Sequence, residues 1–143
     1  MIELDDDKDR LNLARIHGWL AFSYWSPGIE REVVERAIAG SHCLGAYRRG
    51  EQVGFARAIT DYTTFAWIAD VWVAEECRGQ GLGQRLARWF IDQPCLTDIR
   101  RIGLTTADAH GVYTKLGFPA LSRPDRYMER LSPKALALLQ AAS

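Results

Sequence analysis

Apolar residues recur at helical spacing in two stretches near the start of the chain. The first stretch has Leu13, Ile16 and Leu20 on one helical face, and the second begins at Val33. Ser26-Pro27-Gly28 separates the two, a combination that ends helices and favours turns. The pattern therefore predicts two amphipathic helices joined by a short connection.

Two strands around a tight turn are predicted next. Gly40 ends the second helix, and Cys43 to Tyr47 and Val53 to Thr60 flank a turn at Arg49-Gly50-Glu51. In the second strand large residues alternate with small ones, and the small ones are Gly54, Ala56, Ala58 and Thr60. We expect a hairpin with one face of small residues, on which a flat group could lie close.

A strand, a glycine-rich loop and a helix follow in that order. Phe65 to Val73 has the aromatic and β-branched composition of a central strand buried on both faces, and Asp70 interrupts it. The loop Glu75 to Gly83 leads into a helix that starts at Leu82 and stops before Pro94. The remaining predictions are a strand at Ile99 to Thr105, a helix at Ala109 to Leu116, a strand at Tyr127 to Leu131 and a helix at Lys134 to Ala142. This order is typical of a mixed α/β domain, of the α+β kind, whose middle strands form an antiparallel meander.

Length and composition limit the domain count and the partners. With 143 residues, 48% of them hydrophobic, the sequence predicts a single domain over residues 1–143. Its 18 basic and 18 acidic residues cancel, so no positive field would hold nucleic acid or an anionic membrane. The first ten residues are acidic, unlike a secretory signal, and the longest apolar runs fall far short of the roughly 20 residues that cross a bilayer. We expect a soluble, cytoplasmic protein with no nucleic-acid or membrane partner.

The three cysteines indicate no metal site. Cys43, Cys77 and Cys95 are spaced like neither a disulfide framework nor paired zinc ligands. A nucleophilic cysteine would need one of the three histidines as a base, and this interpretation stays open. The simpler interpretation is that Cys43 and Cys95 pack as small apolar residues while Cys77 lies in a loop.

The segment Arg78-Gly79-Gln80-Gly81-Leu82-Gly83-Gln84 carries the most specific signal in the chain. Glycines at a helix entrance let backbone N–H groups converge, and the helix N-terminus adds about half a positive charge, so the loop suits a phosphate group. Arg78 adds a fixed cation. The spacing G-x-G-x-G matches neither the P-loop nor the dinucleotide fingerprint. The loop therefore predicts a phosphate cradle of another kind, the alternative being an ordinary tight turn.

Two motifs, taken together, resemble the GCN5-related N-acetyltransferases, the GNAT family. Residues 78–83 fit that family's coenzyme signature, R/Q-x-x-G-x-G/A, at the end of its fourth strand. Further on, Tyr113-Thr114-Lys115-Leu116-Gly117-Phe118 fits the family's tyrosine element at the end of the following helix. The resemblance covers Leu11 to Leu131 and implies splayed fourth and fifth strands, helices on both faces of the sheet, and acetyl-CoA as the acetyl donor.

The resemblance also assigns residues to the coenzyme. It implies that the pyrophosphate is held by Arg78, Gly79, Gln80, Gly81, Leu82, Gly83 and Gln84, and the pantetheine arm by Val71 and Val73. Thr106 stands where many members have an asparagine that helps to hold pantetheine, and His110 is a further candidate contact. An N–H group of the fourth strand near Trp72 or Val73 is the expected oxyanion donor.

Acetyl transfer to an amine needs an acid for the departing thiolate and a base for the amine proton. The resemblance implies that Tyr113 is the acid, the alternative being a core aromatic at a helix end. Asp70 is the predicted base, because a carboxylate in an apolar strand is costly unless it is paired or faces a wet cleft. The alternative is a structural carboxylate paired with Arg57, and Asp61 and His110 are weaker candidates for the base.

The acceptor is expected over the splayed strands, beside the connection between the first two helices. Tyr24 and Trp25 in that connection could form an aromatic wall for an amine or alkyl chain, the alternative being that both belong to the core. The predicted function is acetyl transfer to a primary amine of a small molecule or peptide. The alternatives are a catalytically silent acyl-CoA sensor and an acetyltransferase for protein lysines or N-terminal amines. A homodimer is a further expectation, since an apolar patch could come from Trp19, Trp89, Leu136, Leu138 and Leu139.

Overall fold

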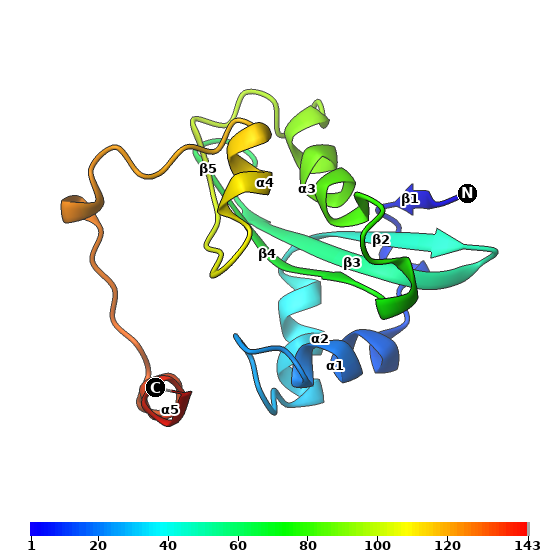
Figure 1. The fold of residues 1–143 in the computed structure, drawn as a ribbon, viewed down its shortest axis with the longest axis horizontal. Coiled ribbons are helices and arrows are strands. Elements are labelled where there is room, and N and C mark those ends of the chain that lie inside the picture. Colours follow the sequence, from blue (N-terminus) through cyan, green and yellow to red (C-terminus); the bar gives the residue numbers. More distant parts are fainter. Residues whose placement is uncertain (143) are drawn as a thin grey trace.

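The computed structural model, which describes residues 1–142, is built around a mixed sheet of five strands in sequence order (Figure 1). The strands are β1 (Glu3–Asp5), β2 (His42–Arg48), β3 (Glu51–Thr60), β4 (Phe65–Val73) and β5 (Arg101–Gly103). Each of the first four is antiparallel to its neighbour, and β5 is parallel to β4. The predicted fold class and meander are confirmed, and β1 is an added edge strand that the acidic N-terminus did not indicate.

Helices cover both faces of the sheet, as Figure 1 shows. Helices α1 (Leu13–Ala21) and α2 (Arg31–Ala39) pack on one face, where Ile16, Leu20 and Val34 meet Phe55 and Cys43. Helices α3 (Leu82–Asp92) and α4 (His110–Lys115) lie on the other.

Helix α3 packs on the small residues of β3. Leu82, Leu86 and Phe90 are buried on one side of this helix, and each fully buried side chain of this size contributes about 1.5–3 kcal/mol. A Cβ added at Gly54 would lie 3.4 Å from Cδ1 of Leu86. The expectation that a flat ligand lies on the small-residue face is therefore wrong, because α3 occupies it.

The structure differs most from the sequence prediction after α4. Strand β5 is confined to three residues of the predicted Ile99–Thr105 stretch. Tyr127 to Leu131, predicted as a strand, belongs to no strand, because no sheet edge of this chain lies beside it. The chain from residue 119 to 142 instead leaves the body as an extended arm with a short 3-10 turn, η3 (Pro124–Arg126), and a final helix, α5 (Pro133–Ala142). We call residues 119–142 the C-terminal arm.

One of the three cysteines lies differently from the simpler sequence interpretation, since Cys95 is exposed. Cys77 lies in the connection between β4 and α3 as expected, in the 3-10 turn η2 (Glu75–Cys77), where it is buried against the α3 side of the core. Cys43 is buried as expected. The ring nitrogens of His17 and His42 contact Ile29, Tyr62 and Asp6 and no cysteine, so a nucleophilic cysteine gains no support from them.

Two features are absent from residues 1–142, a cluster of metal ligands and a helix that could span a membrane. No group of three or more His, Cys, Asp and Glu side chains there is arranged to hold a metal ion. Within the same range, no helix has the length and hydrophobicity that crossing a bilayer requires.

Candidate active site

The glycine-rich loop connects the end of β4 to the start of α3. Gly79 and Gly81 have φ angles of +79° and +78°, in the left-handed region that side chains with a Cβ rarely adopt. A Cβ added at either position would meet nothing within 4 Å. Glycine is therefore required at these positions by the backbone conformation and not by lack of space, and the space outside the loop is open. Gly81 is also the residue that precedes α3, which fixes the start of that helix.

The backbone of this loop offers unused hydrogen-bond donors. The N–H groups of residues 79–84 make no hydrogen bond within the described chain, and the next one, of Arg85, bonds to the carbonyl of Gly81 at 3.0 Å. Free N–H groups at the entrance of an eleven-residue helix, together with its dipole, form an anion site. The loop residues therefore fit a pyrophosphate group.

Arg78 lies against the end of β4 at the start of this loop. Its Nε donates to the carbonyl oxygen of Val73 at 3.0 Å, and its guanidinium lies 5.2 Å from the ring centroid of Trp72. Val73 also lies beside the first turn of α3, since a Cβ added at Gly83 would be 3.7 Å from its Cγ2. The structure thus brings Val73, Arg78 and the glycines together as the sequence predicted, with Arg78 held in place by strand β4.

A cleft of about 570 Å³ opens beside β4, where the sheet separates. Strand β5 pairs with β4 only from Phe65 to Trp67, so the six residues from Ile68 to Val73 have no strand partner on that side. The splay between the two strands is therefore present. The cleft is lined by β4, by the loop before α4, and by the connection between α1 and α2, with Tyr24, Trp25, Asp70, Val71, Thr106 and Tyr113 among its residues.

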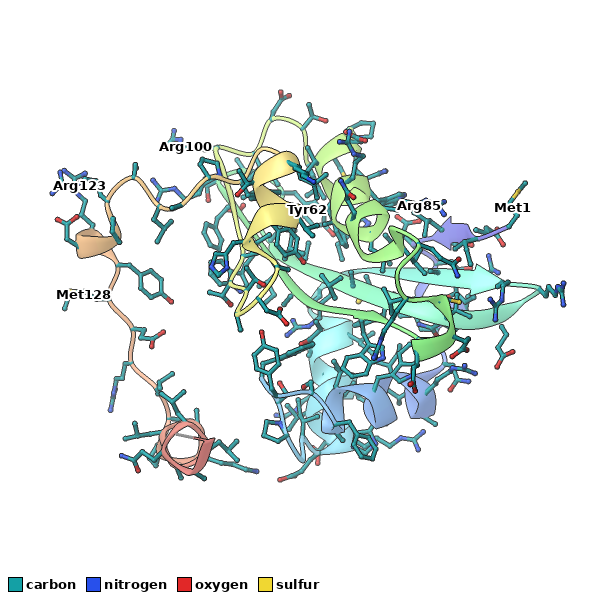
Figure 2. All side chains as sticks on the ribbon, viewed as in Figure 1. Met1, Tyr62, Arg85, Arg100, Arg123 and Met128 are labelled. Atoms are coloured by element: carbon teal, nitrogen blue, oxygen red, sulfur yellow. The ribbon has the colours of Figure 1, made fainter. Side chains whose placement is uncertain are left out.

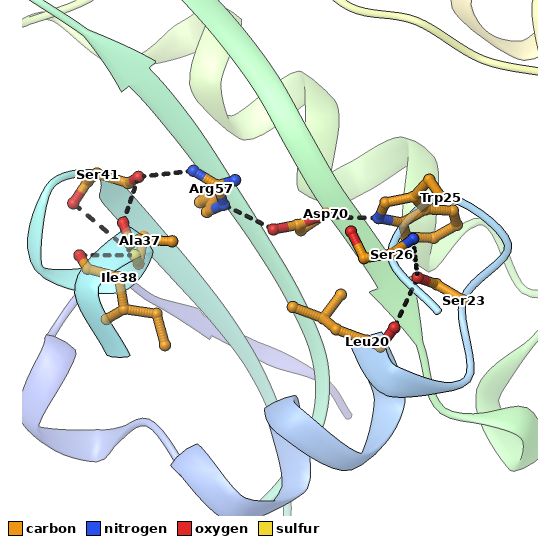
Figure 3. Close-up of polar contacts among 10 residues, drawn as sticks. Leu20, Ser23, Trp25, Ser26, Ala37, Ile38, Ser41, Arg57 and Asp70 are labelled. Carbon is orange, nitrogen blue, oxygen red and sulfur yellow. Dashed lines mark hydrogen bonds and ion pairs between the residues drawn. The ribbon is translucent and has the colours of Figure 1, made fainter. Parts of the chain in front are cut away.

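Asp70 occupies a bulge in β4 at the floor of this cleft. Phe55 pairs with Trp72 and Arg57 with Ala69, so two residues of β4 lie opposite one residue of β3. The φ angle of Asp70 is +56°, a conformation that is strained for a residue with a Cβ and is most tolerated by Asn and Asp. The bulge turns the Asp70 carboxylate toward the α1–α2 side of the sheet (Figure 3).

Both carboxylate oxygens of Asp70 already accept hydrogen bonds (Figure 3). The Nε of Arg57 donates to Oδ2 at 2.7 Å, and the indole Nε1 of Trp25 donates to Oδ1 at 2.8 Å. Arg57 in turn donates from Nη1 to Oγ of Ser41 at 3.0 Å. The side chains of Asp70 and Arg57 are only 9% and 16% exposed, so this is a nearly buried ion pair. The arrangement is that of the structural alternative, in which the carboxylate is paired with Arg57.

Tyr24 and Trp25 close over the cleft from the connection between α1 and α2. The Tyr24 hydroxyl accepts a hydrogen bond of 3.2 Å from the N–H of Ala107, on the far side of the cleft, while Trp25 reaches Asp70 on its floor. The two rings meet edge to face with centroids 5.0 Å apart. Both side chains are exposed, so the alternative that they are core aromatics is wrong.

Tyr113 lies in the wall of the same cleft on helix α4. Its ring packs edge to face on Phe118, with centroids 6.2 Å apart, which fixes its orientation. Burial, with smaller contributions from Tyr24 and Asp108, raises the pKa of the Tyr113 hydroxyl above its ordinary value of 10.0. The hydroxyl is therefore protonated at neutral pH and can donate a proton.

The other predicted site residues lie at different distances from the cleft. Thr106 lines it, and its Oγ1 also accepts the N–H of Ala109 at 3.0 Å, which orders the start of α4. His110 is exposed at the first position of α4 and is not among the cleft residues. Asp61 is in the β3–β4 turn, where hydrogen bonds from Thr64 above all hold the pKa of its carboxyl well below the usual range. A group so placed is a poor base.

Sequence reasoning missed part of the lining. Asp108 and Trp67 face the cleft, although neither stands in a recognisable motif. Trp67 alternates with Phe65 and looks like any aromatic of a buried strand, and Asp108 follows a segment without regular structure. Trp67 reaches the cleft from the paired part of β4 and Asp108 from the loop before α4, and no local pattern encodes that these two segments meet.

Comparisons with known proteins agree with this geometry. A sequence profile described as the acetyltransferase (GNAT) family matches residues 11–118. A solved structure from Xanthomonas campestris, described as an acetyltransferase of the GNAT family, is 39% identical and superposes with a TM-score of 0.89 over 93% of this chain and 94% of that one. A Gibberella zeae protein described as an acetyltransferase is 28% identical over 115 residues, or 64% of this chain and 63% of the relative, so the match spans less than two thirds of that protein. The glucosamine-6-phosphate N-acetyltransferase of Arabidopsis thaliana, at 13% identity and a TM-score of 0.61 over 92% of this chain, is similar in fold alone.

Proposed function

Since the chain belongs to the acetyltransferase (GNAT) family, we propose that it transfers the acetyl group of acetyl-CoA to a primary amine of a small molecule or peptide. One observation carries this proposal: a single strand, β4, ends in a loop with free N–H donors and also borders the splayed cleft that contains Tyr113. A coenzyme whose phosphates occupy the loop would extend along the open side of β4 toward that tyrosine.

The residues that would hold acetyl-CoA form two groups. The backbone N–H groups of residues 79–84 would bind the pyrophosphate, with Arg78 as a nearby cation. The unpaired edge of β4, including Val71 and Val73, would hydrogen-bond the pantetheine amides as a neighbouring strand would. When bound, acetyl-CoA supplies a thioester carbonyl for attack by an amine and a thiolate as the leaving group.

Tyr113 would act as the general acid toward the coenzyme sulfur. Its burial keeps the hydroxyl protonated at neutral pH, and its contact with Phe118 limits the directions in which the hydroxyl can point. Charge that develops on the carbonyl oxygen would be stabilised by an N–H group of β4 near Trp72 or Val73, beyond the bulge at Asp70. Asp70 then serves to keep the bulge in place, since both of its oxygens are in use.

The cleft favours a cationic acceptor of small size. Asp70 is neutralised by Arg57, whereas Asp108 has no ion-pair partner among residues 1–142, so the cleft carries a net negative charge. Tyr24 and Trp25 add aromatic faces that attract ammonium groups. Its volume, about 570 Å³, is within the range of about 300–1,000 Å³ that is usual for small-molecule sites. These features support a small amine or a peptide end as the acceptor.

Calorimetric titration with acetyl-CoA tests the coenzyme site directly. Gly81→Glu places a carboxylate in the loop, and we expect it to abolish saturable binding of acetyl-CoA and of desulfo-CoA. Gly50→Glu is the matched control, because Gly50 has a φ of +79° and open space around it but lies in the β2–β3 turn. Loss of binding in both variants, or tight binding of ATP to the wild type, would argue against a specific coenzyme site.

A turnover assay separates the enzyme from a silent acyl-CoA sensor. Wild type is incubated with acetyl-CoA and a panel of small amines, peptides with free N-terminal amines, and lysine peptides, and the release of free thiol is followed. We expect thiol release with small amines or peptide amines beyond slow hydrolysis. Tight binding of acetyl-CoA without turnover on any amine would leave the sensor as the function, and turnover on lysine peptides alone would move the acceptor to proteins.

A further inference from the structure

The cleft contains one carboxylate whose charge is not neutralised. In the described chain, five of its lining residues carry a titratable side chain, namely Tyr24, Arg57, Asp70, Asp108 and Tyr113. Tyrosine and arginine side chains hold their protons at neutral pH, and both oxygens of Asp70 already accept hydrogen bonds. The Asp108 carboxylate makes no hydrogen bond and no ion pair within residues 1–142. Of these five side chains, Asp108 is therefore the one that is free to take a proton.

The backbone on both sides of Asp108 is held by residues of the cleft. The N–H of Ala107 donates to the Tyr24 hydroxyl at 3.2 Å, and the N–H of Ala109 donates to Oγ1 of Thr106 at 3.0 Å. Figure 2 shows the loop before α4, in yellow, reaching toward the connection between α1 and α2, while the C-terminal arm leads away from it. Asp108 therefore has a fixed place at the cleft, although its side chain is exposed.

The same short segment also carries Tyr113. The carbonyl oxygen of Ala109 accepts the backbone N–H of Tyr113 at 3.2 Å, in the first turn of α4. After burial and Tyr24, the charge of Asp108 is a further cause that raises the pKa of the Tyr113 hydroxyl, so the two side chains interact. A group that can accept a proton and a group that can donate one thus line the same cleft from one end of one helix.

An amine acceptor has to lose a proton before it can attack the thioester. An alkyl amine is an ammonium ion at neutral pH, like the side chain of lysine, and its nitrogen then has no lone pair to form a bond. The unpaired carboxylate of Asp108 attracts such a cation into the cleft. When the acceptor and acetyl-CoA fill the cleft, both charges lose water, and this favours the neutral pair of carboxylic acid and amine over the ion pair.

We propose that Asp108 is the proton acceptor for the amine, a further catalytic residue of this cleft, an inference that rests on the proposed acetyl transfer. One ammonium proton passes to the Asp108 carboxylate, and the exposure of this side chain lets the proton leave to water. The amine nitrogen then bonds to the carbonyl carbon of the thioester, and the C–S bond breaks as the thiolate takes the proton of Tyr113. The second proton of the nitrogen returns to Tyr113, so each turnover releases one proton to water.

Kinetics with a charged and an uncharged acceptor test this role. The charged acceptor is the most active amine of the turnover panel, and the uncharged one is its analogue with fluorine beside the amine-bearing carbon, which is neutral at neutral pH. We expect Asp108→Asn to lower kcat/KM for the charged amine by about 10²-fold or more and to change it little for the uncharged amine, which attacks without first losing a proton. With the charged amine, the loss should shrink as the pH rises and free amine replaces the ammonium ion. Asp98→Asn, at an exposed carboxylate outside the cleft, is the matched control and should leave both rates unchanged.

The outcomes distinguish this role from a structural one and from a failure of the proposed function. Calorimetry should give the same dissociation constant of acetyl-CoA for Asp108→Asn as for wild type, because the side chain is exposed and lies outside the glycine-rich loop. An equal loss with both amines, a loss that is the same at every pH, or full activity of the variant would overturn the assignment of Asp108 while acetyl transfer stands. A wild type that binds acetyl-CoA and acetylates no amine would overturn the proposed function and this assignment with it.

Discussion

Replacing Asp70 by Asn separates a structural carboxylate from a catalytic base. The side chain keeps its shape, but one acceptor oxygen becomes an NH₂ group and the negative charge is lost. Both present partners are donors, Arg57 Nε and Trp25 Nε1, so the amide can accept from only one of them. The change therefore acts directly on the network that holds the bulge in β4.

The expected loss of stability follows from the burial of this network. A buried donor left without an acceptor costs about 1–3 kcal/mol. Removing one partner of a buried ion pair costs about 3–5 kcal/mol, and here both partners are largely inaccessible, at 9% and 16% exposure. The two costs overlap, and Trp25 is partly solvated, so we expect Asp70→Asn to lower the free energy of unfolding by about 3 kcal/mol. For a chain of this length that corresponds to a fall in Tm of about 10 °C.

Urea unfolding of four proteins measures the effect and its origin. These are wild type, Asp70→Asn, Arg57→Met and the double variant, which together form a cycle for the interaction between the two residues. Asp98→Asn, a substitution of the same kind at an exposed carboxylate, is the control and should stay within about 0.5 kcal/mol of wild type. We expect the free energy of unfolding of the double variant to fall by less than the sum of the two single losses. Each single change leaves the other residue of the ion pair buried without its partner, and the double variant does not.

The pH dependence of turnover completes the test. If Asp70 holds the bulge, Asp70→Asn lowers the rate by a similar factor at every pH and leaves the shape of the profile unchanged. If Asp70 is the base, the variant loses the acidic limb of the profile. An unfolding free energy within about 0.5 kcal/mol of wild type would refute the structural reasoning, since the network could not then stabilise the bulge.

Three further substitutions each test the role of a single side-chain group. Tyr113→Phe should lower kcat by about 10²–10⁴-fold, because the general acid is lost. The affinity for acetyl-CoA should stay unchanged, because the hydroxyl makes no hydrogen bond within residues 1–142 that the substitution would break. A kcat equal to that of wild type in steady-state assays would exclude Tyr113 as the acid. Burial raises the pKa of the Cys43 thiol from 9.0 to about 11, so the folded chain keeps its proton longer than the unfolded chain and stability falls by up to about 1.4 kcal/mol per pH unit as pH rises through that window. Cys43→Ala should flatten this fall in urea titrations, and an unchanged slope contradicts the assignment. Tyr47→Phe removes a buried hydroxyl without a partner in the described chain, so the free energy of unfolding should stay the same or rise by about 1 kcal/mol, and a clear loss in thermal melts would show a hidden partner.

The elements that the sequence predicted well are those with a strong local pattern. Strand β4 runs from Phe65 to Val73 as its aromatic and β-branched composition indicated, and α3 begins at Leu82, directly after the left-handed Gly81. The conformation of the glycine-rich loop was predictable for the same reason, because positive φ angles demand glycine at fixed positions. Strand β1 was missed because Glu3 to Asp5 has no apolar alternation, and its pairing with β2 depends on a distant segment.

The sequence predicted which residues of the candidate site stand out, but it did not predict which of two roles such a residue has when the role depends on its partners in the fold. Asp70 was singled out because a carboxylate in an apolar strand needs a partner or water. The sequence left open which of these it has, and the structure shows two partners, Arg57 from the neighbouring strand and Trp25 from a loop 45 residues earlier. Asp70 reaches these donors from a bulge between the paired residues Ala69 and Trp72, and such a bulge depends on how β4 pairs with β3, which no local pattern encodes.

The segment 127–131 shows why a correct local pattern can still give a wrong element. Its residues favour an extended chain, and the chain there is extended, but a strand exists only where an edge accepts its hydrogen bonds. Composition reports the first condition and carries no information on the second, which depends on where the arm leaves helix α4. The prediction of a strand and its absence from this sheet therefore have one physical cause, because the sheet ends at β5 and the path of the arm does not bring residues 127–131 to that edge.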